Sequence, residues 1–162
     1  MFDRLLRDRA NVTLAGVPDG AESFAIARLL EESGADGLGL VFVARDATRM
    51  AMVAEALGFF APDVDVLQLP AWDCLPYDRV SPNAAISARR LLALGQLARG
   101  IGSGRKTILM TTLNAALQRL PERAFMAEQT FSMAPGNRVD MAAISSWLEM
   151  NGFSRTPTVR ET

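Results

Sequence analysis

The chain contains 162 residues, 49% of them hydrophobic, and its 17 basic and 18 acidic side chains give a formal net charge of -1. This length suits one domain, or one domain and part of a second, and the near-zero charge provides no general attraction to nucleic acid or to a membrane surface. Because the sequence has no histidine, catalytic triads that use an imidazole and zinc sites with histidine ligands are excluded.

The cellular compartment is predicted from the cysteine content and from the N-terminus. The single cysteine, Cys74, cannot form an intrachain disulfide and is expected to be a structural free thiol in a reducing environment. Residues 1–10 are charged where a signal peptide is apolar, and the longest apolar stretch, residues 50–61, is interrupted by Glu55. We therefore expect a soluble cytoplasmic protein that does not enter membranes.

Repeated strand-helix units are predicted from the first 120 residues. The strands are predicted from apolar runs at residues 11–15, 38–44, 64–69 and 107–112. A helical pattern follows each run: the first places Ile26, Leu29 and Leu30 on one face, the second is capped by Asp46, and the others cover residues 84–99 and 113–120. Consecutive units of this kind predict an α/β fold, in which an open parallel sheet carries helices on both faces.

The pattern changes after Pro121, where a second, smaller domain is predicted to begin. Its expected elements are a strand at residues 129–133, a turn at residues 135–137 and a helix at residues 141–151 with Asp140 as its N-cap. The last ten residues read as a strand with nothing after it, so the chain is expected to stop within this domain. The predicted organisation is an α/β domain at residues 1–122, followed by the start of a small α+β domain at residues 123–162.

Residues 16–23 lie where a phosphate-binding loop would lie, between the first predicted strand and its helix. Such a loop needs the pattern Gly-x-x-x-x-Gly-Lys-Ser/Thr, because backbone amides and a lysine hold the phosphates and the hydroxyl holds magnesium. The first glycine, Gly16, and the hydroxyl residue, Ser23, are present. After Gly20, however, Ala21 replaces the second glycine and Glu22 replaces the lysine. The charge at the lysine position is therefore reversed.

Two interpretations of this loop remain open. Glu22 and Asp19 would repel a polyphosphate and Pro18 removes one backbone amide, so the segment reads as a phosphate loop that has lost its phosphate. An ordinary Gly/Pro turn with no such ancestry fits the same residues. We expect no bound cofactor in either case. The rival function, from another class, is a nucleotide-binding NTPase domain that uses the loop at residues 16–23.

Residues 100–107, GIGSGRKT, imitate the same motif, but Arg105 replaces the second glycine. The segment follows a predicted helix and precedes a predicted strand, so Lys106 would not lie at a helix N-terminus. It is interpreted as a flexible connector.

A proline-rich loop links the third predicted strand to its helix. Pro70, Pro76 and Pro82 restrict its backbone, and it carries Trp72 and the only tyrosine, Tyr77. Rigid aromatic loops that follow a strand often form binding surfaces in α/β proteins. The alternative is that the two aromatic side chains cap the core.

Arg90 is predicted to be buried, because helical spacing places it on the core-facing side of its helix. A buried guanidinium needs a carboxylate or several carbonyl groups as partners. Asp73 and Asp78, in the loop just before this helix, are the nearest acids and the predicted ion-pair partners. With no histidine and no third ligand, the two aspartates are not expected to form a catalytic or metal site.

Several strings of the sequence resemble one protein family in their order and spacing. They are GVPDGAESF, LPAWDCLPYDRVSP, ISARRLLAL, TTLNAALQRLP and WLEMNGFSRTPTVRE. Together they span essentially the whole chain and resemble the N-terminal module of bacterial transcription-repair coupling factors. The resemblance implies a module similar to the B subunit of the bacterial excision nuclease, with a degenerate helicase-like first domain that has lost its ATP motif.

The resemblance also implies a role in nucleotide excision repair. In the family, the small domain docks the excinuclease A subunit. Other domains engage RNA polymerase and DNA, among them a translocase that uses ATP and magnesium to displace stalled polymerase. Those domains are absent from this chain, which is therefore expected to be a noncatalytic protein-interaction module without catalytic residues, metal or cofactor.

Two departures limit what the resemblance implies. The excinuclease B subunit carries a β-hairpin for damaged DNA in its first domain, whereas here Pro82 leads directly into a predicted helix. Together with the near-zero charge, this argues against DNA binding. The family continues after the position of Glu161 with a Gly-Glu-aromatic-x-x-Arg-Gly segment that contacts the A subunit. We therefore expect weak or no binding of that subunit, and no partner-binding residue is assigned.

Overall fold

The computed structural model describes residues 11–33, 37–75, 77–100, 105–131, 133, 135–136 and 138–156. These residues fall into two compact units, which divide between Gln129 and Thr130 and are described separately. The assignment of residues 1–122 and 123–162 to particular domain types stays a prediction.

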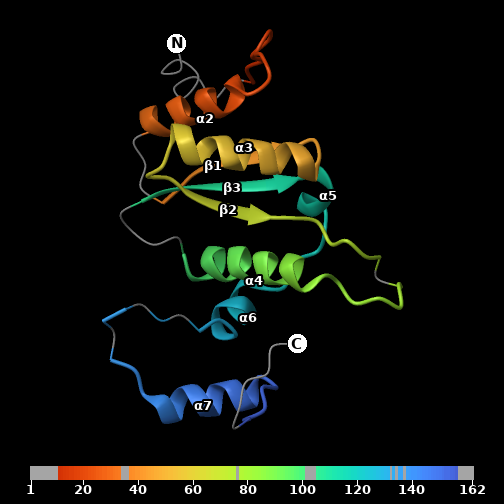
Figure 1. Ribbon diagram of the computed structural model, residues 1–162, viewed down its shortest axis with the longest axis vertical. Coiled ribbons are helices and arrows are strands. Elements are labelled where there is room, and N and C mark those ends of the chain that lie inside the picture. The colour runs from red at the N-terminus through yellow and green to blue at the C-terminus, as the bar shows by residue number, and fades with distance from the viewer. Residues whose placement is uncertain are drawn as a thin grey trace. The chain divides into compact units, whose positions relative to one another are not determined.

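The first unit is built on a parallel sheet (Figure 1). Within the described residues its strands are β1 (Gly37–Ala44), β2 (Asp65–Leu69) and β3 (Lys106–Thr112), in the order β1-β3-β2. The central strand, β3, is covered on both faces, which is why it reads as a continuous apolar run. Its Ile108 and Met110 are completely buried.

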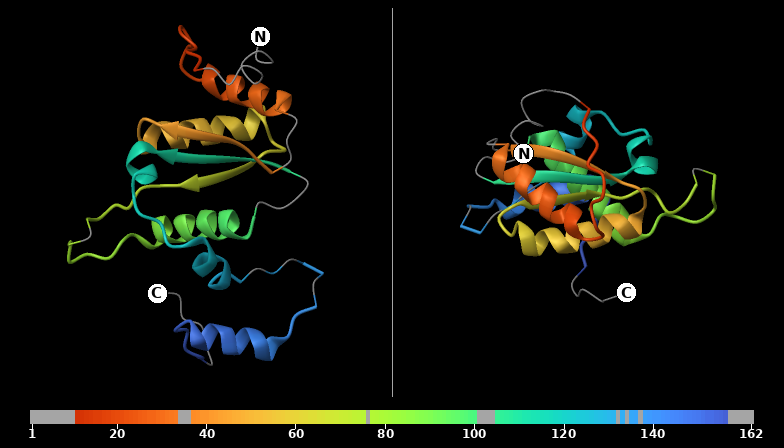
Figure 2. Two further views of the ribbon diagram at one scale, coloured as in Figure 1. Left: turned by 180° about the vertical axis from the view of Figure 1, so that it is seen from behind. Right: turned by 90° about the horizontal axis from the view of Figure 1, so that it is seen from above.

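Helices cover both faces of this sheet (Figures 1 and 2). On one face lie α2 (Ala21–Glu32) and α3 (Ala47–Phe60); on the other lies α4 (Ala84–Arg99), with α6 (Arg123–Glu128) packed on it. The short α5 (Leu113–Ala116) follows β3 directly. This arrangement confirms the predicted α/β class with an open parallel sheet.

The hydrophobic core lies between the sheet and the layer formed by α2 and α3. Its buried members are Ile26, Ala27 and Leu30 of α2, Met50, Val53 and Leu57 of α3, and Ala44, Ile108 and Met110 of the sheet. Because these side chains pack α2 against α3, the first turns of both helices are fixed side by side. That placement brings the loop at residues 16–23 next to α3.

Polar side chains cap the helices of the first unit. Asp46 accepts a hydrogen bond from the backbone N–H of Arg49 at 2.7 Å, which confirms it as the N-cap of α3. Asn83 caps α4 in the same way, through the N–H of Ala85 at 2.8 Å. The loops before these helices therefore end at defined residues.

The second unit, as far as it is described, consists of α7 (Met141–Met150) and irregular segments. Asp140 accepts hydrogen bonds from the N–H groups of Ala142 and Ala143 and is the N-cap, as predicted. Past the end of the helix Gly152 has a φ of 86°, in the left-handed region. The predicted turn is present at residues 135–136, while Asn137 lies outside the described residues.

Two predicted strands are wrong. Residues 11–15 are irregular and exposed, and at 129–133 Gln129 instead closes α6 through its N–H bond to Phe125 at 3.0 Å. A β-prone run becomes a strand only where a neighbour supplies hydrogen-bond partners, and no strand of the described residues pairs with either run. Of the predicted terminal strand, residues 153–156 are irregular and the rest lie outside the described part.

The helical predictions are more accurate. The helix at residues 84–99 is confirmed, whereas the one expected at residues 113–120 ends at Ala116 and α6 was not predicted. No helix in the described ranges has the length and apolar character needed to cross a bilayer.

Candidate functional site

The loop before α2 forms a tight turn. Gly20, at the N-cap position of α2, has a φ of 90° and no side-chain cap accompanies it. The N–H of Ala21 donates to the carbonyl of Pro18 at 3.0 Å. One of the amides that a phosphate would use is therefore already occupied within the turn.

Both acids of this loop pair with Arg49 of α3. The Arg49 guanidinium donates to Glu22 and, at 3.1 Å, to Asp19. The hydrogen bond to Glu22 is the main reason why the pKa of Arg49 is raised above its ordinary value. Glu22, which stands where a phosphate loop carries lysine, is thus neutralised by a cation from the neighbouring helix.

Ser23 does not present its hydroxyl to solvent. Its side chain is buried, and Oγ has no hydrogen-bond partner. In a phosphate loop this hydroxyl would have to reach a magnesium ion in an open site. Among the described residues, no group of three or more Cys, Asp or Glu side chains is placed to hold a metal ion.

The second glycine-rich segment uses its cations for structure. Lys106 Nζ donates to the carbonyls of Leu30 and Glu31, at the C-terminal end of α2. Arg105 donates to the carbonyls of Pro62 and Asp63 and pairs with Asp65 at 3.3 Å. Lys106 is therefore at a helix C-terminus and not at an N-terminus; residues 101–104 lie outside the described part.

Arg90 is buried, as predicted, but its partners differ from the prediction. Its Nη1 donates to the carbonyl oxygen of Pro70, and its guanidinium carbon lies 4.5 Å from the ring centroid of Trp72. That distance fits a cation–π interaction. The Nε atom is buried without a hydrogen-bond partner, and burial lowers the pKa of Arg90 from its ordinary value.

The predicted ion pair of Arg90 with Asp73 or Asp78 is therefore wrong. Asp73 accepts from the N–H of Asn83 at 3.2 and 3.3 Å, and Asp78 accepts from the N–H of Leu75 at 2.7 Å. Both carboxylates thus accept from backbone amides of the exposed loop. Pro70, the residue after β2, supplies a carbonyl to the buried guanidinium instead.

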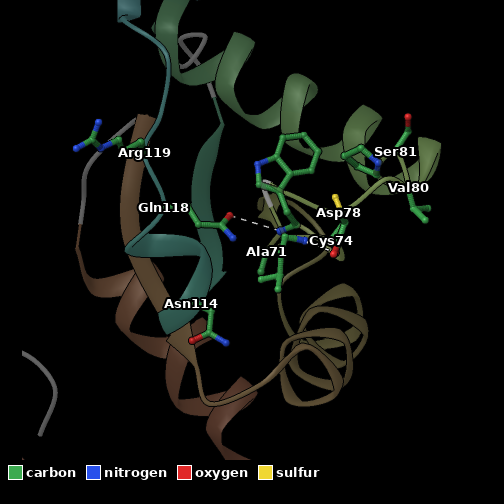
Figure 3. Close-up of a pocket in the computed structure, with 11 residues that line it drawn as sticks. Ala71, Cys74, Asp78, Val80, Ser81, Asn114, Gln118 and Arg119 are labelled. Atoms are coloured by element: carbon green, nitrogen blue, oxygen red, sulfur yellow. Dashed lines mark hydrogen bonds between the residues drawn. The ribbon is translucent and has the colours of Figure 1, made fainter.

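A cavity of about 910 Å³ opens between the proline-rich loop and α5 (Figure 3). Its lining residues follow the C-terminal ends of β2 and β3, the edge that carries ligand sites in parallel α/β sheets. The N–H of Trp72 donates to Gln118 Oε1 at 3.4 Å across this cavity. Its lining residues are Ala71, Trp72, Cys74, Leu75, Asp78, Val80, Ser81, Pro82, Asn114, Gln118 and Arg119.

The two aromatic residues of this loop behave differently. Trp72 covers the buried Arg90, whereas Tyr77 is 96% exposed and caps nothing in the core. Pro76 lies outside the described residues. The structure brings Trp72 and Arg90 together but keeps the two aspartates and Tyr77 at the surface.

Two residues of this region were not found by sequence reasoning. Arg49 pairs with both acids of the loop at residues 16–23, and Gln118 accepts a hydrogen bond from the N–H of Trp72 beside the cavity. Arg49 is 27 residues from Glu22 and Gln118 is 46 residues from Trp72, so no local spacing indicates either contact. The one indication in the sequence is that residues 16–23 contain two acids, Asp19 and Glu22, and no basic residue.

Comparison with known proteins gives a consistent result. No family model matches the chain. A transcription-repair-coupling factor of Myxococcus xanthus is 32% identical in an alignment 164 positions long. The alignment covers 96% of this chain and 13% of the relative. Proteins of the same name from Haemophilus influenzae and Escherichia coli are 27% and 28% identical over 91% and 75% of this chain, and 12% and 10% of their own length.

The chain spans about a tenth of the length of these relatives. The match nevertheless extends over nearly all of this sequence, and it recurs under one name in different bacteria. The chain therefore belongs to the transcription-repair-coupling factor family.

Proposed function

We propose that this chain is a noncatalytic protein-interaction module of a transcription-repair coupling factor. The observation that carries the proposal is the pairing of Glu22 with Arg49 at the position where a phosphate loop needs its lysine. The Arg49 guanidinium balances the negative charge of Glu22, so this position needs no charged ligand.

Nucleotide binding would require several changes to this loop at once. A polyphosphate would approach Asp19 and Glu22, compete with both for Arg49, and find the amide of Ala21 already bonded to Pro18. The hydroxyl of Ser23 would have to turn out of the core to reach a metal ion. These features favour a module without ATP over the rival NTPase function.

Exposed apolar side chains around the proline-rich loop support an interaction role. Leu75 and Val80 line the cavity and are exposed, and Tyr77 of the same loop is exposed as well. The hydrogen bonds of Asp73 and Asp78 hold this loop. Large apolar and aromatic groups that a rigid loop holds in solvent are typical of protein-binding surfaces.

For the longer protein we propose the activity that the family resemblance implies. It would be a cytoplasmic ATP-dependent DNA translocase that displaces stalled RNA polymerase and recruits the excinuclease A subunit in nucleotide excision repair. ATP and magnesium would bind in domains outside this chain. The present residues would contribute to partner recognition.

Titration of the excinuclease A subunit tests this proposal. The same A-subunit preparation is titrated by calorimetry with this chain and with a longer fragment of the family protein from the same source that extends through the rest of the small domain. We expect the longer fragment to bind at least ~100-fold more tightly, a difference of about 2.7 kcal/mol, because the family resemblance places the main contacts after Glu161. No binding by the longer fragment would overturn the proposed partner, and equal affinities would place the contacts within the present residues.

A further inference from the structure

The loop side of the cavity beside α5 is apolar. Trp72, Leu75 and Val80 of the proline-rich loop line it, and Leu75 is 70% exposed while Val80 is 73% exposed. Most of the surface of these two side chains therefore faces solvent. The volume of about 910 Å³ lies near the upper end of the range found for ligand sites, so the cavity has room for a large apolar group.

The opposite side of the cavity is polar and uncharged. Asn114 and Gln118, four residues apart, line it, and Figure 3 shows the Gln118 side chain pointing toward the loop. Gln118 Oε1 accepts the N–H of Trp72 at 3.4 Å. Within the described residues, the Asn114 side chain makes no hydrogen bond and Nε2 of Gln118 donates none. Carboxamide donors and an acceptor are thus available to a ligand.

The charged residues of the cavity are not directed at a ligand. Asp78, the only acid of the described lining, accepts a hydrogen bond from the N–H of Leu75 at 2.7 Å and so is used within the loop. Arg119 is the only base of that lining, and its side chain extends away from Gln118 and the loop (Figure 3). A phosphate or carboxylate group would need a cation directed into the cavity. The lining therefore favours a ligand without charge.

We propose that this cavity binds an extended, uncharged peptide segment of a partner protein. The proposal rests on the interaction role proposed above and names the kind of segment that is recognised. A large apolar side chain of the peptide packs against Trp72 and Leu75, and its main chain lies along Asn114 and Gln118. Each residue of an extended chain presents an N–H donor and a carbonyl acceptor, and a carboxamide can bind both.

A peptide fits these features better than a nucleic acid strand or a small molecule does. A single strand would bring a phosphate with each nucleotide to a site that directs no cation at it. A small molecule confined to the cavity would leave Tyr77 of the same loop 96% exposed, whereas a peptide that continues along the loop would cover this ring. Exposed tyrosine on a held loop is typical of protein-binding surfaces.

Selection of phage-displayed random heptapeptides tests the proposal without a known ligand sequence. Peptides are selected on the wild type after depletion on the double variant Leu75→Ser/Asn114→Ala, which circular dichroism first shows to be folded. Both altered side chains are exposed, so neither substitution disturbs the core. We expect enriched peptides that carry one large apolar residue between uncharged residues. No enrichment, or enrichment of peptides rich in acidic or basic residues, would overturn the proposal.

Titration of an enriched peptide then locates the site. The chain has two tryptophans, Trp72 and Trp147, so a Trp147→Phe background makes Trp72 the only indole, and its fluorescence should change on binding. In this background Leu75→Ser should raise the dissociation constant at least ~10-fold, because apolar contact area is lost. Asn114→Ala should raise it about 5-fold, the loss expected for one hydrogen bond between neutral groups.

Two matched substitutions outside the cavity serve as controls. Leu117→Ser removes an apolar side chain that is 77% exposed, and Asn11→Ala removes an exposed carboxamide. Neither should change the dissociation constant by more than ~2-fold. Equal losses in the controls and in the cavity variants would contradict the proposed site, and displacement of the peptide by an oligothymidylate would show that a nucleic acid strand is the ligand instead.

The outcome is separate from that of the A-subunit titration. If the longer fragment binds the A subunit but no peptide binds the cavity, only the present inference fails. If peptides bind as expected but the longer fragment does not bind the A subunit, the proposed partner fails and the peptide site stands.

Discussion

Glu22 at the start of α2 and Arg49 in the first turn of α3 form an ion pair in which each side chain is only 24% exposed. The backbone of Arg49 is itself held, because its N–H donates to the N-cap residue Asp46. The cap of α3 and the ion pair that holds the loop at residues 16–23 are therefore linked through one residue, Arg49. A change at Asp46 acts on both.

Asp46 should make stability depend on pH. The N–H of Arg49, and then the Arg45 side chain, lower the pKa of Asp46 below 3.8. Because the folded state favours the charged carboxylate, its contribution to stability is complete above pH 3.8 and is lost as the pH falls through the folded-state pKa. Asp46→Asn keeps a capping side chain without the charge. Urea unfolding should show the wild type more stable than Asp46→Asn at pH 7, with the difference disappearing in acid; a difference that stays constant with pH would contradict this.

Arg90 should contribute to stability mainly through packing and through its contacts with Pro70 and Trp72. Arg90→Ala removes a large buried side chain and should lower the free energy of unfolding by about 3 kcal/mol. Arg90→Met keeps most of the volume and removes a desolvated charge, so it should cost about 1 kcal/mol or less. Chemical denaturation measures both values. Asp73→Asn and Asp78→Asn test whether Arg90 forms an ion pair with either aspartate. If either substitution lowered the free energy of unfolding as much as Arg90→Ala does, an ion pair with that aspartate would be supported after all.

Gly20 should be required for its backbone conformation alone. A Cβ atom at this position would meet nothing within 4 Å, but the φ of 90° disfavours any L side chain. Gly20→Ala should therefore destabilise by about 1 kcal/mol. Gly58 is the matched control, since a Cβ there also meets nothing and its φ is not in that region. Gly58→Ala, within α3, should raise the free energy of unfolding by roughly 0.5–1 kcal/mol. Thermal unfolding measures both variants, and the prediction is refuted if both substitutions change the stability in the same direction.

Lys106 should stabilise the C-terminal end of α2. Its ammonium group binds two carbonyls there, and a cation at a helix C-terminus typically contributes about 0.3–1 kcal/mol. Lys106→Met should lower stability by that amount and weaken hydrogen-exchange protection in the last turn of α2. Arg119→Met, at an exposed position, is the control. Equal effects of the two changes would show that Lys106 has no capping role.

The sequence predicted the parts of the fold that depend on local patterns. The strands at β1, β2 and β3 were found because buried parallel strands read as continuous apolar runs. The burial of Arg90 followed from helical spacing alone. The incorrectly predicted strand at residues 11–15 shows the limit, because strand formation depends on a neighbouring strand that local sequence does not reveal.

The site was predictable only in part for the same reason. The reversed charge at Glu22 is visible in the sequence, but its partner Arg49 comes from a different helix, and helix surfaces carry many arginines without such roles. Arg90 was assigned to the nearest acids in sequence, whereas its position in space offers the carbonyl of Pro70 and the ring of Trp72. Choosing between these partners requires the path of the loop, which proline content alone does not give.

Titration with a fluorescent ATP analogue in the presence of magnesium tests the noncatalytic assignment most directly. Circular dichroism first shows that the wild type, Glu22→Lys and Arg49→Ala are folded. The three proteins are then compared up to about 1 mM nucleotide, a concentration that half fills even a weak site with a binding free energy of about -4.1 kcal/mol. We predict no saturable binding and no ATP hydrolysis by any of the three, because the amide of Ala21 and the hydroxyl of Ser23 stay unavailable whichever charge is changed. Saturable binding by the wild type that is lost in Gly16→Val would contradict the account.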